Sequence, residues 1–246
     1  MPPHSHATAD SPGAGPDPHA ATDTQRIQEQ SDLCSTLEPQ DIARLRAIAQ
    51  PQDYAAGEVV LRQGPKVDAV FLPCSGCLMV ERSGAGGQRQ VLAFLYAGYF
   101  LGFNTSSRFL YSVVALEKSS VLRFPAENFR KLAQELPALR DNIGRINNLV
   151  LSRVLDHLFA IGQKRAHARV AFLLWELWSR AAADGQQHLV HLPMRRADIG
   201  AYLGLTLETT SRAFSRLRRD GIIATPDNSS VRILDAGALQ ELADVK

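Results

Sequence analysis

The sequence predicts an α+β fold in which an antiparallel β-sheet domain is followed by one long helix and a small, mostly helical domain. Three observations lead to this prediction. Short apolar runs separated by glycines lie between residues 54 and 124, apolar residues repeat at helical spacing from 139 to 161, and two helical segments flank Gly204. Regularly spaced short strands with glycine turns are typical of antiparallel sandwiches and barrels, whereas alternating three- and four-residue apolar steps are typical of amphipathic helices.

The composition is that of a globular protein. The chain has 246 residues, of which 45% are hydrophobic and 21% charged, and this length allows one or two domains with a buried core. The formal net charge is only +2, but six arginines between Arg195 and Arg219 oppose two acidic residues in the same segment. Such a basic cluster is expected on a surface that contacts phosphates, although a solvated helix face has the same composition.

We expect residues 1–25 to form a disordered tail, because they are rich in Pro, Gly, Ala, His and Asp and hold no aliphatic side chain larger than alanine after Met1. The tail histidines, His4, His6 and His19, are expected to be solvated rather than to bind a metal. No apolar run reaches the length of a membrane span, and a basic start followed by an apolar core is missing. We therefore expect a soluble, cytoplasmic protein without a membrane partner.

The antiparallel domain is expected to span residues 26–136. A short amphipathic helix is predicted over 37–49. The strand-like runs that follow are 58–61, 69–72, 78–80 and 91–95. The pair Ser75-Gly76 between two of these runs is predicted to be a two-residue hairpin turn, because glycine accepts the positive φ that such turns need.

One long helix is expected over residues 137–163, and it carries two apolar faces. We predict that one face packs on the sheet domain and the other on a second copy of the chain, with burial of both faces in a monomer as the alternative. The residues assigned to the dimer interface repeat at steps of three and four, namely Leu139, Ile143, Ile146, Val150, Val154, His157 and Ile161, and Arg153 borders this row. The neighbouring face holds Leu149, Leu151, Leu155 and Leu158.

Residues 164–246 are predicted to form a second domain built around a helix-turn-helix. Gly204 supplies the permissive backbone of the turn, and Gly200 lets the two helices approach each other closely. Thr206 is the predicted N-cap of the second helix. Two strand-like segments after this helix, 222–225 and 231–234 in the printed sequence, predict a β-hairpin wing.

The second helix is predicted to have an apolar and a polar face. The inward positions are Leu207, Thr210, Phe214 and Leu217. On the opposite face, Glu208 can accept from cytosine, Arg212 can bind guanine and Ser211 can contact thymine or phosphate. Arginines further along are expected to contact phosphates. The residues predicted to bind DNA are Glu208, Ser211, Arg212, Thr206, Ser215, Arg216, Arg219, Arg195 and Arg196.

From Leu192 to Arg212 the sequence resembles the FNR and FixK branches of the CRP/FNR superfamily of bacterial transcription regulators, and the resemblance extends over nearly the whole chain after the tail. In those branches a Glu-x-x-Ser-Arg pattern, matched here by Glu208, Ser211 and Arg212, reads a TTGA–TCAA inverted repeat. The resemblance implies an N-terminal β-roll like that of cyclic-nucleotide-binding domains, a dimerisation helix and a C-terminal winged helix-turn-helix.

The same resemblance implies a homodimeric DNA-binding regulator, an activator rather than a repressor, linked to oxygen, redox or nitrogen-oxide physiology, with RNA polymerase as a partner. It also indicates what the effector is not. The cyclic-nucleotide branch has Gly-Glu before a short helix and Arg-Ser after it, whereas here Phe103 follows Gly102 and no Arg-Ser pair appears, so cAMP is not expected. A standard [4Fe–4S] cluster is not expected either, because only Cys34 lies in the N-terminal region and Leu122 takes the later position.

The remaining cysteines, Cys74 and Cys77, form a Cys-x-x-Cys across the predicted turn, which would place the two thiols on adjacent paired strands, close enough for a disulfide. With Cys34 they could form a redox or unusual metal site, while the alternative is that they are ordinary half-buried side chains. No standard metal site is predicted. A haem- or small-molecule-sensing regulator with its ligand in the β-roll is the alternative function, with His157 as a weak haem-ligand candidate. No nucleophile–base set, phosphate loop or metal-protease spacing is present, so an enzyme is not expected.

Overall fold

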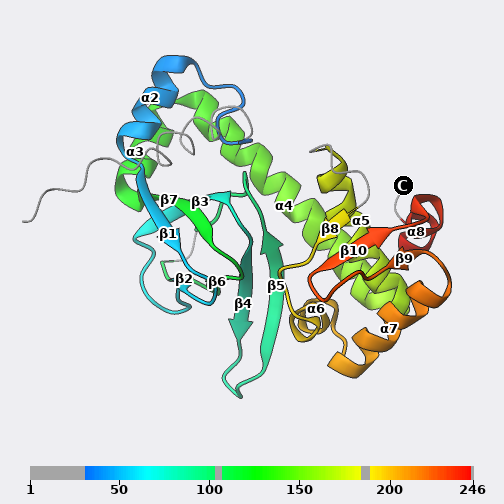
Figure 1. Ribbon diagram of the computed structural model, residues 1–246. Helices are drawn as coiled ribbons and strands as arrows, with labels where there is room; N and C mark the ends of the chain where they lie inside the picture. The colour runs from blue at the N-terminus through cyan, green and yellow to red at the C-terminus, as the bar shows by residue number, and fades with distance from the viewer. Residues whose placement is uncertain (1–30, 103–106, 184–188, 245–246) are drawn as a thin grey trace, which may run out of the picture.

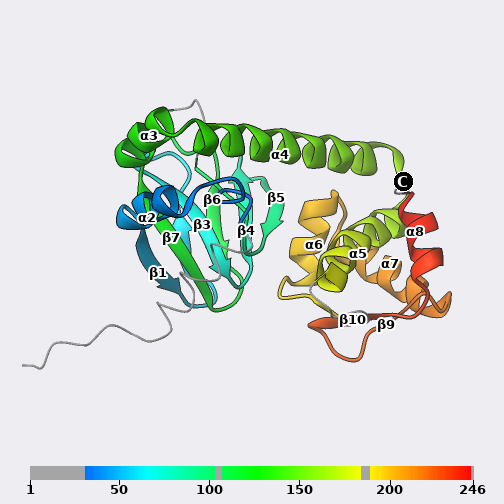
Figure 2. The same ribbon diagram turned by 90° about the horizontal axis from the view of Figure 1, so that it is seen from above.

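The computed structural model describes residues 31–102, 107–183 and 189–244, which form two domains joined by the long helix α4 (Figure 1). Both domains lie on the same side of this helix (Figure 2). The predicted tail at 1–25 and the residues 103–106, on which the expectation about cAMP partly rests, lie outside the described residues. No helix in the described ranges has both the length and the apolar character needed to cross a bilayer.

The N-terminal domain is a β-roll of two antiparallel sheets, as predicted. One sheet has the order β1 (Gln50–Tyr54), β7 (Ser119–Pro125), β3 (Ala69–Ser75). The other has the order β2 (Val59–Leu61), β6 (Ser112–Ala115), β4 (Leu78–Ser83), β5 (Arg89–Leu95). Alternate apolar side chains of both sheets, among them Leu78, Val113 and Val121, are completely buried in one core between them. The four predicted strand runs are therefore confirmed.

The predicted hairpin at Ser75-Gly76 is wrong. Strands β3 and β4 belong to different sheets, and the chain crosses from one sheet to the other at this point. Gly76 does have a positive φ of +79°, but a Cβ there would lie only 2.6 Å from the carbonyl oxygen of Lys118 and 2.3 Å from Ser119 Oγ. Glycine is required here by the close approach of β7 as well as by φ, and turn composition alone does not reveal which strands pair.

Three helices pack against the sheet β1–β7–β3. They are α2 (Pro39–Ala47), α3 (Ala126–Glu135) and the first half of α4 (Pro137–Gln163). Leu136 has extended backbone angles before Pro137, which separates α3 from α4. The side chains of Leu139, Ile143 and Ile146 are buried in the apolar cluster that these helices form with the sheet.

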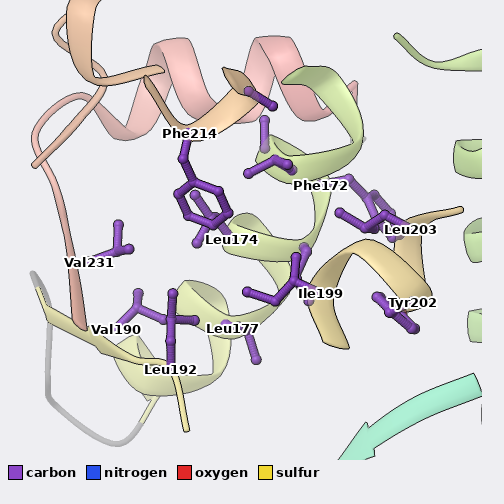
Figure 3. Close-up of a cluster of buried hydrophobic side chains, with 14 of the residues drawn as sticks. Phe172, Leu174, Leu177, Val190, Leu192, Ile199, Tyr202, Leu203, Phe214 and Val231 are labelled. Carbon is purple, nitrogen blue, oxygen red and sulfur yellow. The ribbon is translucent and has the colours of Figure 1, made fainter. Parts of the chain in front are cut away.

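The C-terminal domain confirms the predicted helix-turn-helix and wing. Its elements are α5 (Ala166–Ala183), β8 (Leu189–His191), α6 (Arg196–Leu203), α7 (Leu207–Arg219), β9 (Ile223–Ala224), β10 (Ser230–Ile233) and α8 (Ala236–Ala243). The wing strands β9 and β10 pair, and β8, which the sequence did not indicate, adds a third strand beside β10. Leu174, Ile199, Leu203 and Phe214 converge in the core of this domain (Figure 3).

Candidate nucleic-acid interface

Two glycines give the turn between α6 and α7 its shape. Gly204 ends α6 in the left-handed conformation, with φ of +65°, and its amide donates to the carbonyl oxygen of Gly200. A Cβ at Gly200 would lie 2.8 Å from Leu205 O and 2.9 Å from Thr210 Oγ1. Both glycine predictions are confirmed, because a side chain at either position would strain the backbone or push the two helices apart.

The start of α7 is held by threonines. Thr206 Oγ1 accepts a hydrogen bond from the amide of Thr209 at 3.1 Å, so the predicted N-cap is confirmed. The completely buried Thr210 donates its hydroxyl to the carbonyl oxygen of Thr206 at 2.9 Å. The hydroxyl of Thr206 is thus already used in capping, which orients the first turn of the helix.

The inward face of α7 differs from the prediction at one position. Thr210, Phe214 and Leu217 are buried, but Leu207 is 56% exposed, so its inward placement is wrong. Ala213 is buried in addition. The buried face is centred between Thr210 and Leu217, and Leu207 lies at its edge on the first turn.

The side chains predicted to read bases are exposed on the opposite face of α7. Glu208, Ser211, Arg212 and Ser215 are all exposed. Arg212 donates to Glu208 Oε1 at 2.6 Å, with side-chain exposures of 78% and 74% respectively. An ion pair so exposed adds little to stability. The pair does place an acceptor, Glu208, and a donor, Arg212, side by side on the exposed face of α7.

The predicted phosphate-binding arginines fall into two environments. Arg195, Arg216 and Arg219 are exposed, and Arg216 lies 3.5 Å from Asp220 and 3.4 Å from the ring of His167. Arg196 is instead half-buried, with its guanidinium 3.5 Å above the ring of Phe214. Burial lowers the pKa of Arg196, and one of its buried nitrogens has no partner among the described residues.

Two arginines that the predicted DNA-binding set omits hold this surface together. Arg218 donates to Ser215 at 3.1 Å and to Thr225 at 3.3 Å, and so joins α7 to the wing. Arg169 on α5 donates to the carbonyl oxygens of Lys164 at 2.8 Å and Leu203 at 3.0 Å. Leu203 is the last residue of α6, so Arg169 anchors the helix just before the turn. No local sequence pattern indicates the contact with Leu203, because it lies 34 residues from Arg169 in the chain.

The predicted dimer residues occupy three environments along α4. Leu139, Ile143 and Ile146 are buried within their own chain. Arg153 and His157 face the C-terminal domain and the β-roll, with Arg153 bonded to Tyr99 and the His157 ring 4.1 Å from that of Tyr202, while Ile161 is half-buried. Large apolar side chains of the second half of the helix are exposed: Leu149, Val150, Leu151, Val154, Leu155, Leu158 and Phe159.

Cys77 does not share a cluster with the other two cysteines, as a three-cysteine site would require. Cys74 lies beside the cluster under α2, whereas Cys77 is buried in a different cluster, so the placement of both thiols on adjacent paired strands is wrong. Burial raises the pKa of Cys34 to about 11 and that of Cys77 to about 12, which disfavours the reactive thiolate. Throughout the described part of the chain no three His, Cys, Asp or Glu side chains gather as metal ligands.

Comparison with known proteins identifies the family. Residues 51–135 match the cyclic nucleotide-binding domain and residues 168–242 the Crp-like helix-turn-helix domain. The nitrogen fixation regulation protein FixK of Bradyrhizobium diazoefficiens is 31% identical over 214 residues, which cover 87% of this chain and 90% of that protein. The chain belongs to the CRP/FNR family of transcription regulators.

Further relatives agree with the FNR/FixK branch that the sequence indicated. The transcriptional activator protein FnrA of Stutzerimonas stutzeri is 33% identical over 219 residues, covering 87% of this chain and 89% of that one. The solved structure of FixK2 from Bradyrhizobium japonicum superposes with a TM-score of 0.74 at 28% identity, covering 81% of this chain and 99% of that one. This CRP/FNR regulator is a DNA-binding protein and not an enzyme.

Proposed function

We propose that this CRP/FNR regulator is a homodimeric activator that binds an inverted repeat of the TTGA–TCAA type. The observation that carries the proposal is the uncovered group Glu208, Ser211 and Arg212 on the first two turns of α7. The N-terminal part of a recognition helix enters the major groove, where base edges are accessible. The N-terminal end of a helix such as α7 also favours a phosphate group nearby.

Each of the three side chains has a distinct task in a half site. Arg212 has the bidentate donors that fit guanine O6 and N7, and Glu208 is an acceptor for cytosine N4. Ser211 lies between them and contacts thymine or a phosphate. Arg216 and Arg219 follow on the same exposed side of the helix and contact the backbone, which strengthens binding without selecting a sequence.

The second half of α4 supplies the dimer interface in this proposal. Its exposed leucines at 151, 155 and 158 are each between 56% and 59% exposed and recur at steps of three and four. An apolar stripe of this spacing fits a parallel pairing with the same helix of a second copy. A two-fold symmetric dimer matches the symmetry of an inverted repeat whose half sites lie one helical turn apart.

We assign the regulator to oxygen-, redox- or nitrogen-oxide-linked gene control, acting with RNA polymerase. The support is the branch to which it belongs, since its relatives are named as regulators of nitrogen fixation and as transcriptional activators. The raised pKa values of the buried thiols of Cys34 and Cys77 favour a signal other than thiolate chemistry.

Fluorescence anisotropy with a TTGAT-N4-ATCAA duplex and a scrambled duplex tests the proposal. We expect Arg212→Ala to reduce the preference for the palindrome by about tenfold to a hundredfold, because each bidentate base contact contributes about 1–3 kcal/mol of discrimination. Arg219→Ala should weaken both duplexes alike and reduce the salt dependence. Arg62→Ala, an exposed residue of the β-roll, serves as a control. Equal, salt-sensitive binding of wild-type protein to both duplexes would overturn the proposal.

A further inference from the structure

The C-terminal domain is docked on strand β5, the edge strand of the four-stranded sheet in its own β-roll (Figure 1). Arg89 of β5 forms an ion pair with Asp198 of α6, with a distance of 3.0 Å between Nη2 and Oδ1. The neighbouring Gln90 donates its side-chain amide to the carbonyl oxygen of Ala201. Two successive residues of one strand therefore hold the first helix of the helix-turn-helix.

The polar contacts lie beside a continuous apolar interface. One buried cluster contains Met79 and Phe94 of the β-roll together with Ile199 and Tyr202 of α6. The ring of Tyr202 lies 5.2 Å from that of Phe94 and 4.1 Å from that of His157 on α4, so α4, β5 and α6 meet at this side chain. The two domains thus meet in a packed apolar interface, and the polar contacts at its rim set the orientation of the C-terminal domain.

The position of α6 decides the position of the recognition helix. At Gly200 the two helices approach so closely that a single Cβ would collide with Leu205 and Thr210, so α6 and α7 move as one unit. The exposed Glu208 and Arg212 remain uncovered in the docked arrangement. The docking therefore directs the recognition surface instead of hiding it.

The covalent link from α4 to α5 does not by itself set the orientation of the helix-turn-helix. The chain leaves α4 at Lys164, whose backbone is extended with φ of −87° and ψ of 147°, before α5 begins. Because α4 and α5 are not one continuous helix, the angle between them depends on contacts elsewhere. Arg89 is placed to supply such a contact, since Glu81 Oε2 accepts from its Nε at 2.5 Å while its Nη2 contacts Asp198.

We propose that Arg89, acting through Asp198, is a specificity-determining residue that sets the spacing between the two half sites that the dimer accepts. The inference rests on the proposed function, because only a dimer on an inverted repeat has a spacing to select. In such a dimer the distance between the two recognition helices follows from the paired α4 helices and from the docking angle of each C-terminal domain. Loss of the contact leaves the docking angle to the apolar interface alone, so that the angle varies more and repeats with longer and shorter spacers are accepted.

The test measures the affinity of the full-length protein for TTGAT-Nx-ATCAA duplexes with spacers of three, four and five base pairs, and for a single half site. We expect Arg89→Ala and Asp198→Asn each to reduce the preference for the best spacer by about tenfold, since two such ion pairs act in every dimer. Affinity for the half site stays unchanged. The double variant should be no less selective than either single variant, because both residues act through one contact.

Arg82→Ala removes the same charge from the neighbouring strand of the same hairpin and should leave the spacing profile unchanged. Thermal unfolding shows whether each variant is folded, and Asp198→Asn provides the measurement if Arg89→Ala is unstable. If the wild-type protein prefers one spacer and both variants keep that preference, the inference is overturned while the proposed function stands. If the wild-type protein shows no spacing optimum and binds the half site equally well, the proposed function itself fails.

Discussion

The two halves of α4 carry similar apolar repeats, but the repeat is buried in the first half and exposed in the second. In the first half Leu139, Ile143 and Ile146 are at most 6% exposed, and the buried Asn142 donates to the carbonyl oxygen of Leu33 at 3.0 Å. In the second half Leu151 is 57% exposed and the apolar residues around it are similarly open. An apolar repeat therefore predicts that a helix face becomes buried, but not which surface buries it.

The cause of the difference lies outside the helix. The first half has the sheet β1–β7–β3, α2 and α3 packed against it, so that its apolar face is enclosed within the chain. The second half meets the C-terminal domain on one side, where Ala160 is completely buried, and leaves its leucines in solvent. A large exposed apolar stripe of this kind marks an interaction surface.

The largest effect is expected for removal of a side chain from the covered half. Leu139→Ala should lower the free energy of unfolding by about 3 kcal/mol, because it leaves a cavity at a completely buried position. Leu151→Ala, the matched change in the exposed half, should cost about 0.5 kcal/mol or less in the monomer. Urea unfolding, at protein concentrations too low for the dimer to form, measures the loss of stability in both variants. Similar losses for the two variants would contradict the distinction between the halves.

A charge in the exposed half should act on association instead. Leu155→Glu is expected to raise the dimer dissociation constant at least about thirtyfold, because each dimer would bury two unpaired carboxylates in an apolar interface. Sedimentation equilibrium measures this change. Leu139→Ala is the control, since it should destabilise the fold without changing the association of folded protomers. A Leu155→Glu protein that still dimerises as tightly as the wild type would place the interface elsewhere.

The smallest expected effect is on the pH dependence of stability, at the side of α4 that faces the C-terminal domain of the same chain. There Glu176 of α5 lies near Arg153, Asp156 and Arg180, and burial raises its pKa to about 7. Because the pKa is higher in the folded than in the unfolded chain, the stabilisation is complete below pH ~4.3 and is lost as the pH rises through 7. Glu176→Gln should therefore gain about 2 kcal/mol relative to wild type between pH 5 and pH 8.

Urea unfolding of both proteins at several pH values measures this gain. Burial lowers the pKa of His157 on α4, so the stabilisation of the folded state by this residue is lost as the pH falls, opposite to the effect of Glu176. Since His157 is present in both proteins, the difference between them isolates Glu176. Parallel stability curves across this pH range would mean that Glu176 is solvated in the folded protein.

The helix-turn-helix could be predicted almost completely because its determinants are local. Gly204, Gly200 and Thr206 act on neighbours within ten residues, through backbone conformation, close approach and capping. The exposed base-reading face follows from the same helical period. Only Leu207 was misplaced, because the end of a buried face depends on where the covering helices stop.

The β-roll could be predicted only in part. Its strands follow from alternation and glycine spacing, but their partners do not, which is why the segment at Gly76 was taken for a hairpin. The same error placed Cys74 and Cys77 beside each other on paired strands, whereas they pack against different clusters. The pairing of strands depends on contacts between residues far apart in the chain, and these leave no local pattern.

The sequence by itself determined the order of the elements, the class of each domain and the side chains available to read DNA, because helical period, glycine conformation and capping act over a few residues. The tertiary structure alone decided which half of α4 is enclosed, how Arg169 anchors α6 and how Arg89 meets Asp198. These contacts join segments far apart in the chain, and their stability depends on burial and direction in three dimensions, which residue type and spacing do not specify.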